Sequence, residues 1–483
     1  MLAGTGSDVG KSVISTALCR IFLQDGYSPA PFKAQNMSLN SFVTPEGLEI
    51  GRAQAVQAEA CGLECQSDMN PLLLKPQGSK CSQIVLHGKI WGNADAYDYF
   101  RKEGKERLRS EVSGAYDRLA SVYNPIVMEG AGSISELNLR EGDIVNLSMA
   151  RHAKADVILV GDIDRGGVFA SVYGSIALQE AEDKALIKGI IINKFRGDLR
   201  LFDRGRAIME EITGKPVLGV VPYFTGISIE EEDSVSLSRR PSEADEGRKL
   251  NVAVVMLRYI SNYTDFGVIE RDDRLHVYYT DKERDLSEAD IIIIPGSKST
   301  LQDLYYLRQK GLAKCILQAH ERGTGVIGIC GGYQIMGREV ADPEHVEGDI
   351  ERLPGLGLLP VESVIGGVKN TERVSRQIAG ISVSGYEIHC GETKPAANDT
   401  LKENKCLFES PYATIRDRRT MGTYIHGCLD NKEFLDYVLE PYLGKTERKG
   451  PDYKTFKEEQ YNRLADHVRK HLDMEKLYGI LGT

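Results

Sequence analysis

The chain has 483 residues, which is enough for two to four domains. Its composition, 41% hydrophobic and 27% charged, is that of a globular protein with more than one core. The net charge of −10 argues against a nucleic-acid-binding protein, which would usually carry a basic surplus. The 9 cysteines lack the spacing of a disulfide framework. No signal peptide and no bilayer-length apolar run is visible, so we expect a cytoplasmic protein.

A glycine-rich loop, Gly4-Thr-Gly-Ser-Asp-Val-Gly-Lys-Ser12, precedes apolar residues at helical spacing. Backbone amides of such a loop cradle phosphates, while its lysine reaches the terminal phosphates and its hydroxyl ligates Mg²⁺. The strict pattern has glycine where Thr5 stands; this variant resembles the loop of dethiobiotin synthetase-like ATPases. The alternative is a turn that binds nothing. The residues predicted to bind ATP are Thr5, Gly6, Ser7, Asp8, Val9, Gly10, Lys11 and Ser12.

Four short, apolar, β-branched runs follow, at residues 125–128, 157–160, 189–192 and 217–221. Longer amphipathic stretches separate them, which predicts βαβ units around a parallel sheet. In open parallel sheets, ligands bind beyond the carboxyl ends of the strands.

Polar residues stand where these predicted strands end. Glu129 is expected to complete the Mg²⁺ shell with Ser12. Asn193 stands where related P-loop proteins recognise the base. The alternative for all of these polar residues is capping and turn chemistry. Weaker candidates for binding or activating a substrate are Asp143, Asp162 and Asp164.

The pattern breaks at residues 229–250, where an acidic run and an aperiodic, proline-containing stretch predict a linker. Further strand-like runs at 252–255, 291–294 and 326–329 predict a second α/β domain over 251–444. Residues 445–483 are charged and predict a helical tail that caps the fold or forms an interface. The expected fold class is α/β with two domains, the first being a P-loop parallel-sheet ATPase domain over 1–228.

The most specific segment is Gly328-Ile-Cys330-Gly-Gly332, between a β-run and a predicted helix. The glycines allow a sharp, strained turn that projects the thiol, as in a nucleophile elbow. The backbone N–H of Gly331 points toward a developing oxyanion, and Gly296 is the candidate for a second donor. The alternative is a buried core thiol, which would not require the flanking glycines.

A catalytic cysteine needs a base, because a Cys–His pair is the minimal unit of covalent acyl transfer. His426, in the segment Met421-Gly-Thr-Tyr-Ile-His426-Gly, stands at the end of a predicted strand. His389 is the competing candidate.

The C-terminal part resembles class I glutamine amidotransferases, with Cys330 as nucleophile and His426 as base. That family usually has a glutamate two residues after the histidine, where this chain has Cys428. The corrinoid-amidating branch is similar in lacking that glutamate. The resemblance leaves open what orients His426, and Glu387 and Asp430 are the candidates.

The resemblance to the cobyric acid synthase family covers nearly the whole chain, in the blocks 32–41, 51–55, 69–75, 161–168, 192–198, 260–265 and 295–298. It implies a glutamine-hydrolysing ligase of cobalamin biosynthesis that uses ATP and Mg²⁺. The implied substrate is adenosylcobyrinic acid a,c-diamide, amidated at its b, d, e and g carboxylates through acyl phosphates.

There are three alternatives, of which an inactive regulatory relative is disfavoured by the intact Lys11, Cys330 and His426. The a,c-diamide synthase family performs the same chemistry one stage earlier, but the blocks 33–36 and 193–196 favour cobyric acid synthase. A partition-type P-loop ATPase would be a binding module without glutaminase activity, and the cysteine elbow has no role in it. Neither nucleic acid nor membrane is expected as a partner.

Overall fold

The computed structural model describes residues 1–77, 81–95, 105–230, 237, 240–247, 249–396, 406–444 and 452–482. The chain forms two compact units, each made of separate stretches of sequence. Unit 1 comprises Met1–Met37, Ile50–Ile229 and Lys454–Thr483; unit 2 comprises Ser38–Glu49 and Glu230–Tyr453. Parts of the predicted linker, and residues 445–451 of the predicted tail, lie outside the described residues.

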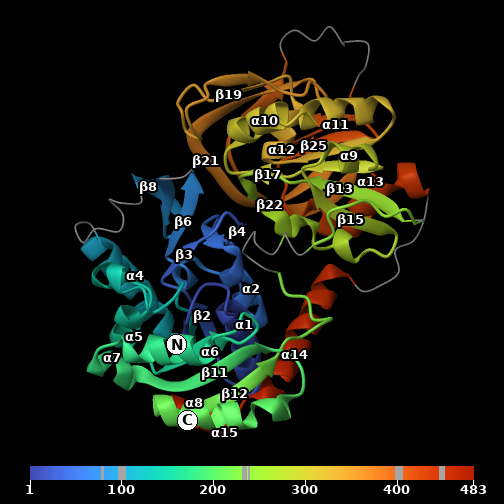
Figure 1. The fold of residues 1–483 in the computed structure, drawn as a ribbon. Helices are drawn as coiled ribbons and strands as arrows, with labels where there is room; N and C mark the ends of the chain where they lie inside the picture. The colour runs from blue at the N-terminus through green and yellow to red at the C-terminus, as the bar shows by residue number, and fades with distance from the viewer. Residues whose placement is uncertain are drawn as a thin grey trace. The chain divides into compact units, whose positions relative to one another are not determined.

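Unit 1 is organised around a parallel sheet, as the alternating pattern predicts (Figure 1). Its strand order is β1 (Leu2–Gly4), β10 (Val157–Asp162), β11 (Ile187–Phe195) and β12 (Val217–Pro222). A parallel pair, β2 (Ala30–Phe32) and β9 (Ile126–Met128), continues it, because Glu129 after β9 bridges to Leu2. The helices of this part are α1 (Lys11–Gln24), α4 (Lys105–Ala120), α5 (Leu147–Ala153), α6 (Val168–Ala177), α7 (Ala181–Leu186) and α8 (Asp203–Thr213).

A smaller sheet and one helix complete the N-terminal part of unit 1. The sheet has the order β3 (Gln35–Met37), β6 (Leu72–Gln77), β7 (Cys81–Leu86) and β8 (Lys89–Asp95). The helix is α2 (Arg52–Ala60). It carries three buried polar side chains, those of Arg52, Gln54 and Gln57, which is unusual for a core-facing helix.

The C-terminal helices α14 (Tyr453–His471) and α15 (Met474–Leu481) are part of the core of unit 1 from Lys454 onward. Leu464 and Val468 of α14 are buried in one apolar cluster with Leu18 and Phe22 of α1. The predicted tail is therefore helical in its described part, and it is a structural element of the first unit.

Unit 2 has a seven-stranded sheet, in the order β15 (Leu275–Thr280), β13 (Leu250–Val255), β16 (Ile291–Ile294), β18 (Gly325–Ile329), β25 (Thr420–Thr423), β24 (Ala413–Asp417) and β23 (Phe408–Ser410). The pairs from β15 to β25 are parallel and the last two are antiparallel. Its helices are α9 (Glu283–Ser287), α10 (Thr300–Gln309), α11 (Leu312–Glu321), α12 (Gly331–Met336) and α13 (Lys432–Leu443).

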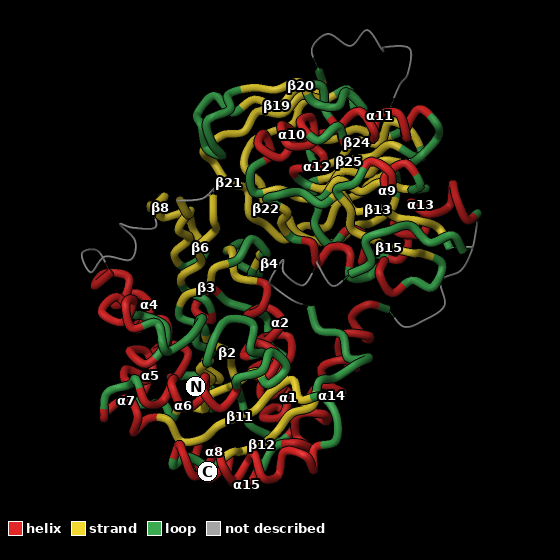
Figure 2. Tube along the Cα trace, in the orientation of Figure 1, coloured by secondary structure: helices red, strands yellow, loops and turns green. Residues whose placement is uncertain are grey.

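Shorter strands and a long hairpin lie beside this sheet. β21 (Val361–Ile378) and β22 (Ile381–Pro395) form the hairpin (Figure 2). β14 (Ile260–Ser261) pairs with β17 (Gly296–Ser297), and β19 (Glu339–Ala341) pairs with β20 (Arg352–Pro354) and β21. Among the described helices, none combines the length and apolarity needed to cross a membrane.

The segment Ser38–Glu49 belongs to unit 2, although the residues on both sides of it belong to unit 1. Its strand β4 (Ser41–Val43) packs Phe42 and Val43 against Tyr386 of β22. Glu49 forms a buried ion pair with Lys369 of β21. The structure thus departs from a simple division near residue 229, since part of the N-terminal half completes the C-terminal unit.

Candidate active site

The phosphate loop in unit 1 joins β1 to α1. Gly10, just before α1, has a φ of +96°, a region that glycine adopts without strain. A Cβ atom there would lie 2.1 Å from Nδ2 of Asn193, so no larger residue fits. Asn193 Nδ2 donates to the carbonyl oxygen of Val9 at 2.9 Å, and Thr5 N donates to Val160 O at 3.1 Å. The ends of β11 and β10 therefore hold the loop in shape.

Lys11 folds back over this loop. Its ammonium donates to the carbonyl oxygens of Gly6 and Gly132, both at 2.9 Å. Burial lowers the pKa of Lys11 to about 8, although the negative charge of Glu129 acts to raise it. A phosphate oxygen is a stronger acceptor than these carbonyl groups, so the lysine is available to a bound phosphate.

Glu129 is the centre of a buried polar cluster at the start of α1. Its Oε1 accepts hydrogen bonds from Ser12 Oγ at 2.8 Å and Lys33 Nζ at 2.9 Å, and its Oε2 accepts one from Gln57 Nε2 at 2.6 Å. Burial alone would raise the pKa of Glu129, but Lys33, with help from Gln57 and Ser12, lowers it. The carboxylate is therefore held ionised beside the phosphate loop.

Lys33 and Gln57 were not among the predicted site residues. Lys33 lies within a block quoted for the family resemblance, and a lysine in an apolar strand environment was the available signal. Gln57 gives no such signal, because a glutamine inside a helix is ordinary until its burial is known.

Two of the weaker acidic candidates lie at the end of β10, close to the loop. Asp162 Oδ2 is 3.1 Å from Nζ of Lys194, which also bonds to the carbonyl oxygen of Asp8. Asp164 pairs with Arg196 at 2.6 Å on the surface. Asp162 is thus connected to the phosphate loop, whereas Asp164 is engaged in an exposed ion pair.

Asp143 has the contacts of a capping residue. Its Oδ1 accepts from the backbone amides of Val145 and Asn146 at 2.9 and 3.0 Å, just before α5. Its Oδ2 accepts from Ser148 Oγ at 3.2 Å. This is the turn chemistry that was the alternative at the sequence level.

In unit 2, Cys330 stands between β18 and α12 with φ +52° and ψ −110°, which is a strained conformation for a residue with a side chain. The turn needs its glycines, because a Cβ on Gly332 would lie 1.9 Å from the carbonyl oxygen of Ile294. Cys330 is 6% exposed, and its Sγ lies 3.5 Å from the carbonyl oxygen of Ile388. The geometry is that of the expected nucleophile elbow.

His426 follows β25 and is almost completely buried. Its backbone exchanges hydrogen bonds with Tyr386, and the two rings stack with centroids 5.2 Å apart. Asp265 Oδ2 accepts from Nδ1 of the ring at 2.7 Å, while Oδ1 accepts from the backbone N–H of Gly427 at 3.0 Å. The other ring nitrogen, Nε2, lies 3.3 Å from Nδ2 of Asn262.

The pKa of His426 results from opposing influences. Burial lowers it, but the charge of Asp265 and the interaction with Cys330 outweigh burial and raise the pKa to about 10. An imidazole oriented by a carboxylate and facing a thiol is the arrangement needed for proton transfer from the nucleophile.

The predicted oxyanion donors, Gly331 and Gly296, lie next to Cys330 and His426 respectively. A Cβ on Gly331 would be 2.8 Å from the backbone nitrogen of Ser297, and one on Gly296 would be 3.3 Å from Cε1 of His426. The backbone of β17, the elbow and the histidine ring are therefore in close contact.

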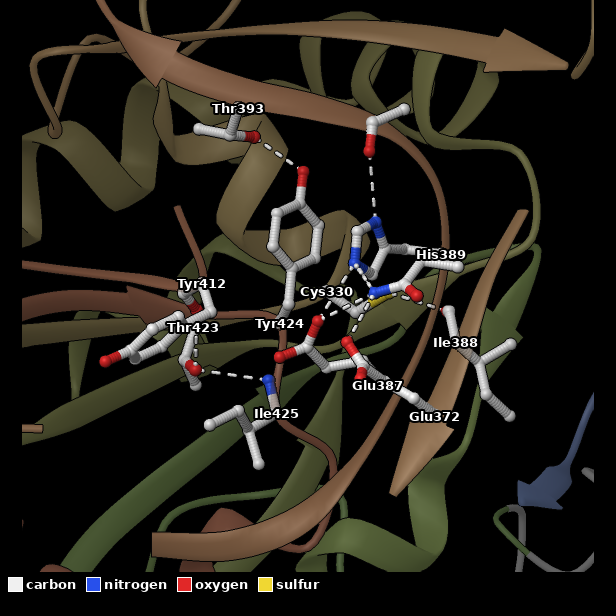
Figure 3. Close-up of polar contacts among 12 residues, drawn as sticks. Cys330, Glu372, Glu387, Ile388, His389, Thr393, Tyr412, Thr423, Tyr424 and Ile425 are labelled. Carbon is white, nitrogen blue, oxygen red and sulfur yellow. Dashed lines mark hydrogen bonds and ion pairs between the residues drawn. The ribbon is translucent and has the colours of Figure 1, made fainter. Parts of the chain in front are cut away.

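His389 and Glu387 flank Ile388, whose carbonyl oxygen contacts Sγ of Cys330. His389 stacks on Tyr424 with ring centroids 3.7 Å apart, and its Nε2 is 3.4 Å from Glu387 (Figure 3). Asp430 follows His426 in a short 3₁₀ turn and donates its backbone N–H to Gly427. Asp265, rather than Glu387 or Asp430, contacts Nδ1 of His426.

The P-loop unit and the unit with a Cys–His–Asp site together define the class of glutamine amidotransferases that have a nucleotide-binding domain in the same chain. Residues 1–237 match the CobQ/CobB/MinD/ParA nucleotide binding domain, and residues 251–434 match the CobB/CobQ-like glutamine amidotransferase domain.

Curated relatives cover the full length of the chain. Cobyric acid synthases of Bacteroides fragilis and Phocaeicola vulgatus are each 61% identical, over 484 and 485 residues, covering 100% of this chain and 98% of theirs. That of Parabacteroides distasonis is 53% identical over 496 residues, covering 99% of this chain and 97% of its own. The chain belongs to the cobyric acid synthase family.

Proposed function

We propose that this chain transfers ammonia from glutamine to the b, d, e and g carboxylates of adenosylcobyrinic acid a,c-diamide, at the expense of ATP, in cobalamin biosynthesis. The full-length similarity to cobyric acid synthases supports the substrate. The observation that carries the chemistry is the contact of Asp265 with Nδ1 of His426, which leaves Nε2 as the ring nitrogen that would take the proton of Cys330.

In the glutaminase reaction, Cys330 Sγ attacks the side-chain amide carbon of glutamine and its proton passes to Nε2 of His426. Asp265 keeps the ring oriented and stabilises the imidazolium that forms. The backbone N–H groups of Gly331 and Gly296 would hold the oxyanion. His426 returns the proton to the leaving ammonia, and water then hydrolyses the thioester to glutamate and free Cys330.

In the ligase reaction, a carboxylate of the corrinoid takes the γ-phosphoryl group of ATP, giving an acyl phosphate and ADP. Ammonia attacks this mixed anhydride, because phosphate is a far better leaving group than oxide. Lys11 would stabilise charge on the transferring group, and Asn193 would recognise the base. Of Asp143, Asp162 and Asp164, Asp162 is the one best placed to assist at this loop.

The hydroxyl of Ser12 and the ionised carboxylate of Glu129 fit Mg²⁺, which prefers oxygen ligands. Both groups lie at the start of α1, next to the loop that would bind the phosphates. Mg²⁺ held there would neutralise charge on the phosphate oxygens.

The test is incubation with the a,c-diamide, ATP and glutamine, followed by mass spectrometry of the corrinoid. Each amidation replaces OH by NH₂, so a stepwise mass decrease is expected. The same incubation with cobyrinic acid separates this function from that of an a,c-diamide synthase. An unchanged a,c-diamide would rule out the proposed substrate.

A second arm tests the ammonia source. Cys330→Ala should lose product formation with glutamine but keep it with ammonium salts, because the ligase reaction does not use the thiol. Continued use of glutamine by this variant would show that Cys330 is not the nucleophile.

A further inference from the structure

Asn262 places an amide group against the catalytic histidine. The residue is 3% exposed, and its Nδ2 lies 3.3 Å from Nε2 of His426. Nε2 is also the atom that must receive the proton of Cys330, so the amide stands beside the reacting centre without belonging to the Cys–His–Asp set.

The orientation of this amide is fixed by Ser41. The backbone N–H of Ser41 lies 2.9 Å from Oδ1 of Asn262, and a backbone N–H can only donate. The oxygen of the amide must therefore face Ser41, which leaves the NH₂ group facing His426. If the amide were flipped, its NH₂ group would face the N–H of Ser41, and this buried hydrogen bond would be lost.

Despite burial, the charge of Asp265 raises the pKa of His426 and so favours the protonated ring. An NH₂ group facing Nε2 acts in the opposite direction and favours the neutral ring. It can donate to Nε2 only while that nitrogen carries a lone pair, as in the neutral ring that gives its Nδ1 proton to Asp265. When Cys330 transfers its proton, Nε2–H and the amide become two donors facing each other. Asn262 therefore opposes the thiolate–imidazolium pair that attack on glutamine requires.

The segment Ser38–Glu49 keeps Asn262 in this place. Asn262 has a φ of +52°, and the next residue, Tyr263, donates its backbone N–H to Oδ1 of Asn40 at 3.2 Å. Ser41 and Asn40 are both buried. The turn that presents the amide is thus held by two hydrogen bonds to a segment supplied by the N-terminal half of the chain.

The same segment is covalently close to the nucleotide site of unit 1. Lys33 precedes Ser38 by five residues, and Gln57 follows Glu49 by eight. Both side chains hold Glu129 beside the phosphate loop. If ligand binding changes the contacts of Glu129, the resulting movement of Lys33 and Gln57 can therefore reach both ends of the segment through a few residues of backbone.

We infer that Asn262 is a positioning residue that caps Nε2 of His426, and that Ser38–Glu49 holds this cap in place until ligands bind to unit 1. The cap keeps glutamine hydrolysis slow while no corrinoid substrate is bound to accept the ammonia. This inference rests on the proposed function, and it assigns the control of the glutaminase to a single amide group.

The experiment measures glutamate release by the full-length protein, first with glutamine alone and then with ATP and the a,c-diamide added. Asn262→Gly tolerates the positive φ and removes the cap. Asn262→Asp keeps an acceptor for Ser41 and replaces the donor by a carboxylate that favours imidazolium. Ala379→Gly, at another left-handed position (φ +50°) on the tip of the β21–β22 hairpin, controls for relief of backbone strain.

Both Asn262 variants should raise glutamate release without ATP and acceptor by roughly 5- to 150-fold, the range of a typical coupling free energy. Stimulation by ATP and acceptor should fall accordingly, and Ala379→Gly should behave like the wild type. The gain should vanish when Cys330→Ala is added, since it depends on the same nucleophile.

Basal hydrolysis that stays at the wild-type level or falls in both variants, while coupled activity persists, would overturn the cap but leave the proposed function intact. A wild type that releases no glutamate even with ATP and acceptor would overturn both. A purely structural role for Asn262 would lower activity in every condition.

Discussion

At the residue scale, Asp265 orients His426 but was not predicted to do so from the sequence. The two residues are 161 positions apart, and only the fold brings them to 2.7 Å. Candidates chosen near His426 in sequence could not include it. The sequence offered one signal. Asp265 is the last residue of the block 260–265, which resembles the family, but no function was assigned to the residues of that block.

Asp265→Asn should keep the shape of the site but remove the charge that stabilises the imidazolium. We expect glutaminase kcat to fall by about 10²- to 10⁴-fold, as for other triads deprived of their carboxylate. Activity with ammonium salts should persist. Asp430→Asn is the matched control, close to His426 in sequence, and an equal loss there would contradict the assignment to Asp265.

The raised pKa of His426 predicts how the stability of unit 2 depends on pH. The folded pKa, about 10, lies above the ordinary value of 6.5. The stabilisation is therefore complete below pH 6.5 and is lost as pH rises through about 10. The difference in Tm between wild type and Asp265→Asn should narrow over that interval. A difference that widens toward alkaline pH would contradict the ion pair.

Lys33→Met should leave the buried charge of Glu129 without its main partner. Removing one member of a buried pair costs about 3–5 kcal/mol, measurable by chemical denaturation. Because the folded pKa of Glu129 is lowered, the stabilisation is full above its ordinary value of 4.5 and lost as pH falls through the folded value. Lys188→Met, at a largely exposed ion pair, should cost about 0–1 kcal/mol.

At the scale of elements, the buried strands were predicted and the partly exposed ones were not. The continuous apolar runs at 157–160, 189–192 and 291–294 all form buried parallel strands, because burial on both faces leaves only apolar residues there. The β21–β22 hairpin was not predicted. Its long strands mix exposed and buried positions, so no continuous apolar run marks them.

The helix α14 was predicted as a helix, but its partner was not. Leu464 is completely buried against α1, and Leu464→Ala should cost about 2–5 kcal/mol of unfolding free energy. The loss should appear in the unfolding transition of unit 1, which is monitored by measuring nucleotide binding as denaturant is added. Leu481→Ala, at a more exposed position of α15, is the control and should change stability little.

At the scale of the whole molecule, the sequence indicated two α/β domains but not their interleaving. Composition and periodicity report local structure, and nothing local distinguishes residues 38–49 from their neighbours as part of the other unit. Their placement follows from long-range contacts such as that of Phe42 with Tyr386.

A fragment of residues 240–453 should therefore be an incomplete glutaminase unit. It lacks β4, so Tyr386 and Ile388 lose the apolar cover of Val43, and Lys369 loses Glu49. We expect a lower Tm than that of unit 2 in the full chain, measured by thermal denaturation. Adding a peptide of residues 36–51 should restore part of the difference. A fragment as stable as the full chain would contradict the role of the segment.

The interleaved units also affect how the protein is made. Chains fold as they leave the ribosome, N-terminal regions first. Unit 1 cannot close its core until α14 has emerged, and α14 follows all of unit 2. Unit 2 in turn uses a segment translated before most of unit 1. Translation that stops anywhere before α14 thus yields a chain without a finished nucleotide-binding unit, so a truncated product should be unable to consume ATP.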